Sequence, residues 1–147
     1  MCSIEDCVRS GRLIPVSVGI PSTRVFAIGD ARSVEVYKNP MNCYTCEDNS
    51  RCVVEGMNAL GESDWVVVGG FAFGPIPDFP AIHVWVKKGS THFDPTWSRL
   101  GGEIQDLARY RYFALAEALP EANGLDHLRK LATEWHLEIL NEHPEVW

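Results

Sequence analysis

Apolar residues recur along this chain with two periods, and the helical period marks three segments. In the segment 42–60, Asn42 is a suitable N-cap, apolar side chains fall at helical spacing, and Gly61 is a suitable end. The C-terminal third repeats this spacing over 103–118 and again, with a leucine-rich stripe, over 124–141. The pattern therefore predicts one helix in the first half of the chain and two helices at its C-terminal end.

The period of a β-strand marks a different set of segments. Residues 65–73 are rich in β-branched and aromatic side chains, and residues 82–87 alternate along a strand. Two adjacent glycines within the first segment indicate a bulge or a close backbone approach. Gly89 predicts a turn that brings 91–94 back as a partner strand, and a further alternating run covers 33–37.

The order of these elements predicts the fold class. Residues 1–32 are punctuated by proline and glycine, which predicts turns and one short strand. An irregular start, then a helix, then strands, then helices is typical of an α+β protein with an antiparallel sheet. We therefore expect a single domain over 1–147, in which an N-terminal Cys-bearing helix packs on a small antiparallel sheet and is followed by C-terminal helices.

The charge of the chain narrows the classes of partner. Thirteen Lys and Arg against 20 Asp and Glu give a net charge of −7, which disfavours nucleic-acid binding through a basic patch. No apolar run approaches the roughly 20 residues that cross a bilayer. The N-terminus carries acidic residues where a signal peptide would be basic. We expect a cytoplasmic, acidic protein without a membrane or nucleic-acid partner.

The cysteines raise the question of a metal or redox site. The chain has five, an odd number that disfavours a disulfide framework: Cys2, Cys7, Cys43, Cys46 and Cys52. Zinc would need four ligands, and the CxxC at 43–46 supplies two of them. A thioredoxin-like site would need a βαβ unit that the pattern does not contain. Zinc and redox chemistry remain alternatives to a thiol site without metal.

Three residues form a candidate catalytic triad. Cys43 follows the N-cap Asn42, and the free N–H groups at a helix start stabilise a thiolate. His83 lies on one strand of the predicted hairpin and Asp94 ends the other, with Gly89 about midway between them. An aspartate beside a histidine fixes the tautomer of the ring and stabilises its charged form. The pattern thus predicts a Cys43–His83–Asp94 triad.

Each member of this triad has an alternative reading. Cys46 flanks the same helix face as Cys43 and becomes the nucleophile if the helix begins later, although packing is its simpler role. Cys43 itself could be a buried core residue. His92 shares a strand face with Asp94 and could replace His83 as its partner. Asp94 precedes a proline and could act only as a turn cap.

The ordered motifs resemble a known family. Asn42-Cys43-Tyr44 before a long helix, then His83-Val84-Trp85, then Asp94-Pro95-Thr96-Trp97 is similar to the transglutaminase-like branch of the papain-like superfamily, most clearly over 37–115. The resemblance implies a papain-like fold and amide or thioester chemistry through an acyl-enzyme, without metal or cofactor. It also implies that Cys43 is the nucleophile, His83 the general base and then acid, and Asp94 the residue that orients it.

Two classes of function follow. The first is a cysteine hydrolase or acyltransferase that acts on a peptide bond, an isopeptide bond or a glutamine side chain, with Asn42, Trp85 and Trp97 as substrate-binding residues. Its protein or peptide substrate would dock on the loop at 74–80. The second is a non-catalytic binding or inhibitor module, of the kind that phages carry, and a zinc-stabilised binder is a variant of it. An open cleft at the sulfur favours the enzyme, and a buried sulfur favours the binder. The oligomeric state is left open.

Overall fold

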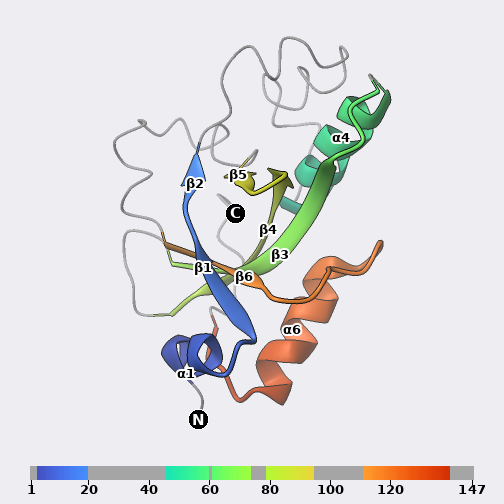
Figure 1. Cartoon of the computed structure of the whole chain (residues 1–147). Helices are drawn as coiled ribbons and strands as arrows, with labels where there is room; N and C mark the ends of the chain where they lie inside the picture. The colour runs from blue at the N-terminus through green and yellow to red at the C-terminus, as the bar shows by residue number, and fades with distance from the viewer. Residues whose placement is uncertain (1–2, 20–45, 60, 74–78, 95–110, 140–147) are drawn as a thin grey trace.

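The computed structural model describes residues 3–19, 46–59, 61–73, 79–94 and 111–139. These residues form three helices and six strands (Figure 1). In chain order the elements are α1 (Ile4–Arg9), β1 (Leu13–Val16), β2 (Val18–Gly19), α4 (Cys46–Ala59), β3 (Trp65–Phe73), β4 (Ala81–Lys88), β5 (Thr91–Phe93), β6 (Arg111–Leu115) and α6 (Gly124–Glu134).

The six strands form one curled sheet in the order β1-β6-β3-β4-β5-β2. Neighbouring strands are antiparallel except for β2, which pairs with β5 in parallel, so the predicted antiparallel sheet is in fact mixed. Only Ser17 separates β1 from β2, and yet these two strands lie at opposite edges of the sheet. They run on as one blue ribbon that ties the two edges together and curls the sheet (Figure 1).

Helix α4 confirms the predicted central helix over the part that the structure describes. Val53 and Met57 are fully buried, and they pack with Trp65 and Val86 of the sheet. Gly61 has a φ of +88°, the left-handed conformation that commonly follows a helix end. The predicted residues 42–45 lie outside the described ranges. The apolar face of α4 is therefore held against β3 and β4.

The three strands predicted near the middle of the chain are also present. Strand β3 has the predicted bounds, β4 extends the predicted 82–87 by one residue at each end, and Gly89 turns the chain into β5 at a φ of +60°. The two faces of β4 separate as the alternation predicts, because Ile82 packs with residues from the helices and Trp85 packs with residues of the other strands. The predicted strand at 33–37 lies outside the described residues.

The C-terminal third differs from the prediction. Residues 111–115, expected in a helix over 103–118, form β6, and the preceding residues 103–110 are outside the described ranges. A strand forms because Tyr112 packs against the strand cluster while its neighbour Phe113 packs on the helix side, so that both faces contribute to packing. The expected helix over 124–141 ends at Glu134.

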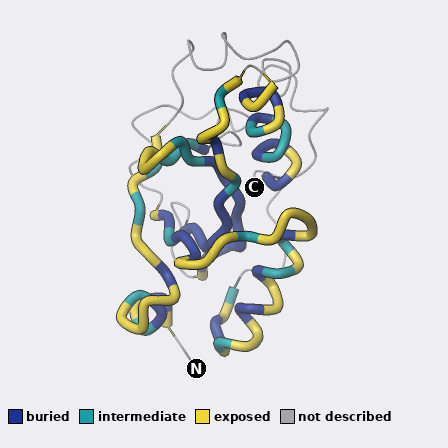
Figure 2. The backbone as a smooth tube through the Cα atoms, turned by 45° about the vertical axis from the view of Figure 1, so that its right-hand side comes forward, coloured by how far each residue is buried: buried dark blue, intermediate teal, exposed yellow. Residues whose placement is uncertain are grey.

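The early end of α6 has a local cause. His136 adopts a left-handed φ of +54°, its N–H donates to the carbonyl of Thr133, and the N–H of Leu137 donates to that of Ala132. These two bonds close a Schellman turn, which ends the helix. Burial follows the central strands and one side of α4 and α6 (Figure 2). None of the described helices is long and apolar enough to span a membrane.

The first residues contain a helix that the pattern of prolines and glycines did not predict. Ser3 caps α1 by accepting from the N–H of Asp6, and the Asp6 carboxylate accepts from the N–H of Ser3 in return. Ile4 and Cys7 of this short helix are buried in the same cluster as α6. The reciprocal cap and two buried side chains are enough to hold a helix of six residues.

Candidate active site

The predicted pair of His83 and Asp94 is present in the structure. The hairpin of β4 and β5 brings Nε2 of His83 within 2.8 Å of Oδ2 of Asp94, and both side chains are buried. The backbone N–H of Asp94 donates to the carbonyl of Gly19 at 3.2 Å. The closing strand β2 therefore fixes Asp94 from one side while the hairpin fixes it from the other.

Among the cysteines that the structure describes, Cys46 is the one that lies beside His83. It begins α4, and it lies close enough to the imidazole to raise the pKa of His83. Strand β5 pairs only with Val86 to Lys88 of β4, so it does not extend along β4 as far as His83. Nearer to His83, the carbonyl of Val84 accepts instead from the Ser50 hydroxyl of α4 at 3.2 Å. This bond holds the first turns of α4 along β4, beside His83.

The charges of the site favour a protonated His83. Burial alone lowers the pKa of this imidazole, but the hydrogen-bonded carboxylate of Asp94 and the nearby Cys46 raise it to about 10. The site therefore places a protonated imidazole beside Cys46 and the carboxylate of Asp94.

Tyr112 is a site residue that the sequence analysis did not predict. Its hydroxyl donates to Oδ2 of Asp94 at 2.6 Å, and its ring lies 5.2 Å from the ring of Trp85 and 5.9 Å from that of His83. Tyr112 belongs to β6, a segment whose sequence pattern indicates a helix. The pattern therefore did not reveal that this segment pairs with β3. Oδ2 of Asp94 thus receives two hydrogen bonds in a buried setting.

The second histidine of the hairpin has another partner. Nδ1 of His92 accepts from Nε1 of Trp85 at 2.9 Å, while burial and the charge of Lys87 lower the pKa of His92. Trp85, predicted to bind substrate, is fully buried, and its ring stacks on His83 with centroids 5.9 Å apart. Among the described contacts, Trp85 supports the imidazole from within the sheet.

Three predicted site residues lie outside the described ranges: Asn42, Cys43 and Trp97. The assignment of Cys43 as nucleophile, and of Asn42 and Trp97 as substrate-binding residues, therefore stays a prediction. For the alternative nucleophile Cys46, the structure gives a position beside the imidazole.

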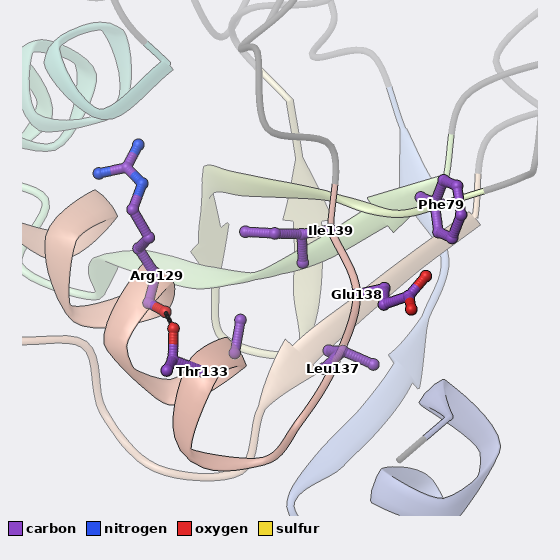
Figure 3. A pocket seen from close by; sticks show the side chains of 7 residues that line it. Phe79, Arg129, Thr133, Leu137, Glu138 and Ile139 are labelled. Atoms are coloured by element: carbon purple, nitrogen blue, oxygen red, sulfur yellow. Dashed lines mark hydrogen bonds between the residues drawn. The ribbon is translucent and has the colours of Figure 1, made fainter. Parts of the chain in front are cut away.

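Cys46 and His83 are enclosed, and a cavity lined by described residues lies elsewhere. Cys46 and His83 are both 0% exposed. A cavity of about 690 Å³ is bounded by α6, the chain that follows it and Phe79 (Figure 3); its lining residues are Phe79, Arg129, Ala132, Thr133, Leu137, Glu138 and Ile139. Within the described ranges, no group of three or more His, Cys, Asp or Glu is arranged to hold a metal ion. Comparisons with protein-family models, with curated proteins and with solved structures find no match to this chain.

Proposed function

We propose that the protein is a cysteine hydrolase or acyltransferase that acts on an amide, with Cys46 as nucleophile, His83 as general base and acid, and Asp94 as the residue that orients His83. The observation that carries the proposal is that His83, whose Nε2 lies 2.8 Å from Oδ2 of Asp94, also has Cys46 beside it. A hydrogen-bonded cysteine, histidine and third orienting group are the parts that a thiol nucleophile needs.

The chemistry uses one acyl-enzyme. The thiolate of Cys46 attacks the carbonyl carbon of the amide, and the C–N bond breaks as the imidazolium of His83 gives its proton to the leaving amine. Neutral His83 then takes a proton from water, which hydrolyses the thioester, or from a second amine, which receives the acyl group. Asp94 holds Nε2, so Nδ1 is the nitrogen that exchanges protons with the sulfur and the substrate.

The substrate class follows from the resemblance to the transglutaminase-like branch. That resemblance favours a peptide bond, an isopeptide bond or a glutamine side chain on a protein. In the family pattern the nucleophile would be Cys43, whereas the position of Cys46 beside His83 supports Cys46. The two cysteines are three residues apart, and the proposal commits to Cys46.

A binding module is the second candidate, and the burial of the site favours it. Cys46 and His83 are both enclosed, and the lining of the cavity beside α6 includes neither residue. In this case the buried network of Cys46, His83, Asp94 and Tyr112 stabilises the sheet, and the protein acts by covering a surface of a partner protein.

Limiting iodoacetamide at pH 7, followed by peptide mass mapping, separates the two candidates. Cys7 is a matched control because it is as buried as Cys46 and lies in α1. An activated Cys46 should be labelled at least about tenfold faster than Cys7, and His83→Gln should abolish this difference. Equal labelling of Cys46 and Cys7 would favour the binding module. Faster labelling of Cys43 than of Cys46 would move the nucleophile to Cys43.

A further inference from the structure

The residue next to Cys46 connects two helices that are far apart in the sequence. We infer that Glu47 is a positioning residue for Cys46, because its carboxylate ties the first turn of α4 to the first turn of α6 and so sets how Cys46 meets His83. This inference rests on the proposed function, since positioning matters only if Cys46 reacts.

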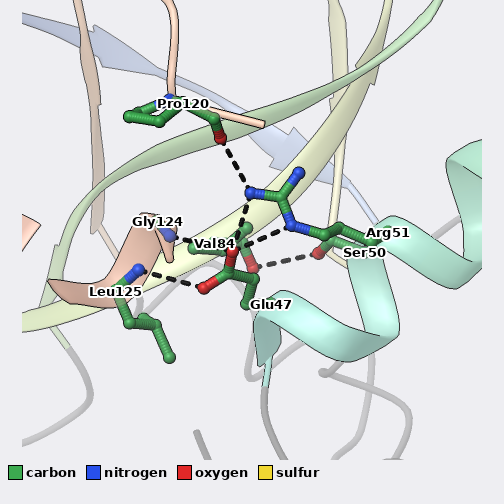
Figure 4. Close-up of polar contacts among 7 residues, drawn as sticks. All are labelled: Glu47, Ser50, Arg51, Val84, Pro120, Gly124 and Leu125. Carbon is green, nitrogen blue, oxygen red and sulfur yellow. Dashed lines mark hydrogen bonds and ion pairs between the residues drawn. The ribbon is translucent and has the colours of Figure 1, made fainter. Parts of the chain in front are cut away.

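The carboxylate of Glu47 is held by three donors (Figure 4). The backbone N–H of Gly124 donates to Oε2 at 2.9 Å, that of Leu125 donates to Oε1 at 3.0 Å, and Nε of Arg51 donates to Oε2 at 2.8 Å. The N-cap residue Asn123 makes no side-chain cap bond and has a left-handed φ of +58°. Glu47 therefore caps α6 from another helix.

The surroundings are fitted to this contact. A Cβ on Gly124 would lie 3.1 Å from Oε2 of Glu47 and 2.7 Å from Cδ2 of Leu119, so the backbone of α6 approaches more closely than a larger residue would allow. Arg51 extends the connection, because its Nη2 also donates to the carbonyl of Pro120 at 2.8 Å. The first turn of α4 is thus fastened to the chain on both sides of the α6 start.

Helix geometry converts this attachment into an orientation of Cys46. Consecutive residues on a helix do not face the same way, so a side chain at 47 that is fixed on α6 sets the rotation at which Cys46 projects. Burial raises the pKa of Glu47, but the bonds from Gly124, Leu125 and Arg51 outweigh burial and lower it, so the group stays a carboxylate.

A change at Glu47 has two effects of opposite sign, which makes the test decisive. Its negative charge beside Cys46 disfavours a thiolate, so loss of the charge alone should make Cys46 more reactive. Loss of the attachment to α6 should make Cys46 less reactive, because the sulfur no longer meets His83 in the right geometry.

The experiment measures the pH profile of Cys46 alkylation in the full chain, with thermal unfolding recorded in parallel. Glu47→Gln keeps the shape and removes the charge. We expect alkylation of Cys46 about tenfold slower at neutral pH, with the midpoint of the profile moved to higher pH. Asp126→Asn is the control, because Asp126 is an exposed carboxylate of the same α6 turn that pairs with Arg129; it should leave the profile unchanged.

Three results would overturn the inference. In the first, Cys46 of Glu47→Gln is alkylated at the wild-type rate or faster, which means that Glu47 acts on Cys46 through its charge alone. If this variant does not fold, Glu47→Asp takes its place, because it keeps the charge and shortens the side chain, and an unchanged profile counts in the same way. Faster labelling of Cys46 and Cys7 alike, with a lower unfolding temperature, would assign Glu47 to stability alone. A wild-type Cys46 no more reactive than Cys7 overturns the proposed function together with this inference, whereas a reactive wild type with unchanged variants overturns the inference only.

Discussion

At the scale of single residues, one oxygen atom organises the site. Oδ2 of Asp94 receives the imidazole of His83 at 2.8 Å and the hydroxyl of Tyr112 at 2.6 Å. A buried carboxylate without partners would carry a large desolvation cost, and charge-assisted hydrogen bonds offset that cost. The position of this oxygen therefore fixes both the direction and the charge of the imidazole ring.

The charge of Asp94 leads to the first prediction, which concerns the protonation of His83. Asp94→Asn removes the negative charge that raises the pKa of His83, so we expect this pKa to fall from about 10 toward or below the ordinary 6.5, because burial then dominates. NMR titration of the histidine side chains measures it. Tyr112→Phe is the matched control, since it removes a hydrogen bond and keeps the charge, and His83 should stay protonated at neutral pH. An unchanged pKa in Asp94→Asn would contradict the prediction.

The site was predictable from sequence only where its contacts are local. His83 and Asp94 are joined by a tight turn at Gly89, so alternation and a turn residue suffice to pair them. Tyr112 reaches the same oxygen from β6, which pairs with β3 although the two strands are far apart in the sequence. The alternation of apolar and polar residues does not specify the register of such a distant pairing. The position of Cys46 beside His83 depends on where α4 lies against β4, which is also a tertiary property.

At the scale of elements, the pairing of β3 with β6 depends on a glycine. Gly70 pairs with Ala114 of β6 on one side and with His83 of β4 on the other. A Cβ on Gly70 would lie 2.0 Å from the backbone oxygen of Phe113. This is the close backbone approach that the two adjacent glycines indicated. The strand that carries Tyr112 can therefore approach β3 only because Gly70 has no side chain.

The second prediction compares two neighbouring glycine substitutions. Gly70→Ala forces backbone to move, so we expect it to lower the free energy of unfolding by about 1–3 kcal/mol or more. Gly69→Ala should cost less, because its Cβ would meet the end of the Leu119 side chain, which can turn away. Urea unfolding of both variants measures the difference. Equal losses would mean that β6 shifts freely and that the close approach is unimportant.

Elements were predicted correctly where composition, alternation or a turn residue marks them. Strand β3 is rich in β-branched and aromatic side chains, the β4–β5 hairpin has alternation and Gly89, and the described part of α4 has apolar residues at helical spacing. The segment of β6 is apolar on both faces because the sheet covers one side and the helices contribute to the other, and a short run of that kind carries no period of its own. The end of α6 depends on a left-handed His136, a conformation that few residues other than glycine adopt.

At the scale of the whole molecule, the candidate site lies where two packed groups meet. Cys46 belongs to the cluster formed by the helices and the outer face of the sheet, whereas Trp85 and Tyr112 belong to the cluster formed by strand residues. His83 contacts both groups, through Cys46 on one side and the two aromatic rings on the other. The geometry of the site therefore depends on how the helices pack against the sheet.

The third prediction concerns metal in the whole protein. A zinc site at Cys43 and Cys46 would occupy the sulfur beside His83, so zinc and the proposed triad exclude each other at Cys46. We expect the purified protein to carry less than about 0.1 zinc per chain, the level of adventitious binding, and we expect EDTA to leave its unfolding temperature unchanged. Stoichiometric zinc, or a large fall in unfolding temperature on chelation, would replace the thiol site with a structural metal.

The strand that ties the two sheet edges also sets when the site can be completed during synthesis. Leu13 pairs with Leu115 and Gly19 with Phe93, so the closing ribbon finds both partners only after the chain has grown through β6. Pairings so distant in sequence form late, because loop closure must precede them. A chain still emerging from the ribosome at Asp94 already carries Cys46 and His83, but it has neither the closed sheet nor Tyr112. Under the proposed function, we therefore expect the site to be completed only after the strand that carries Tyr112 has joined the sheet.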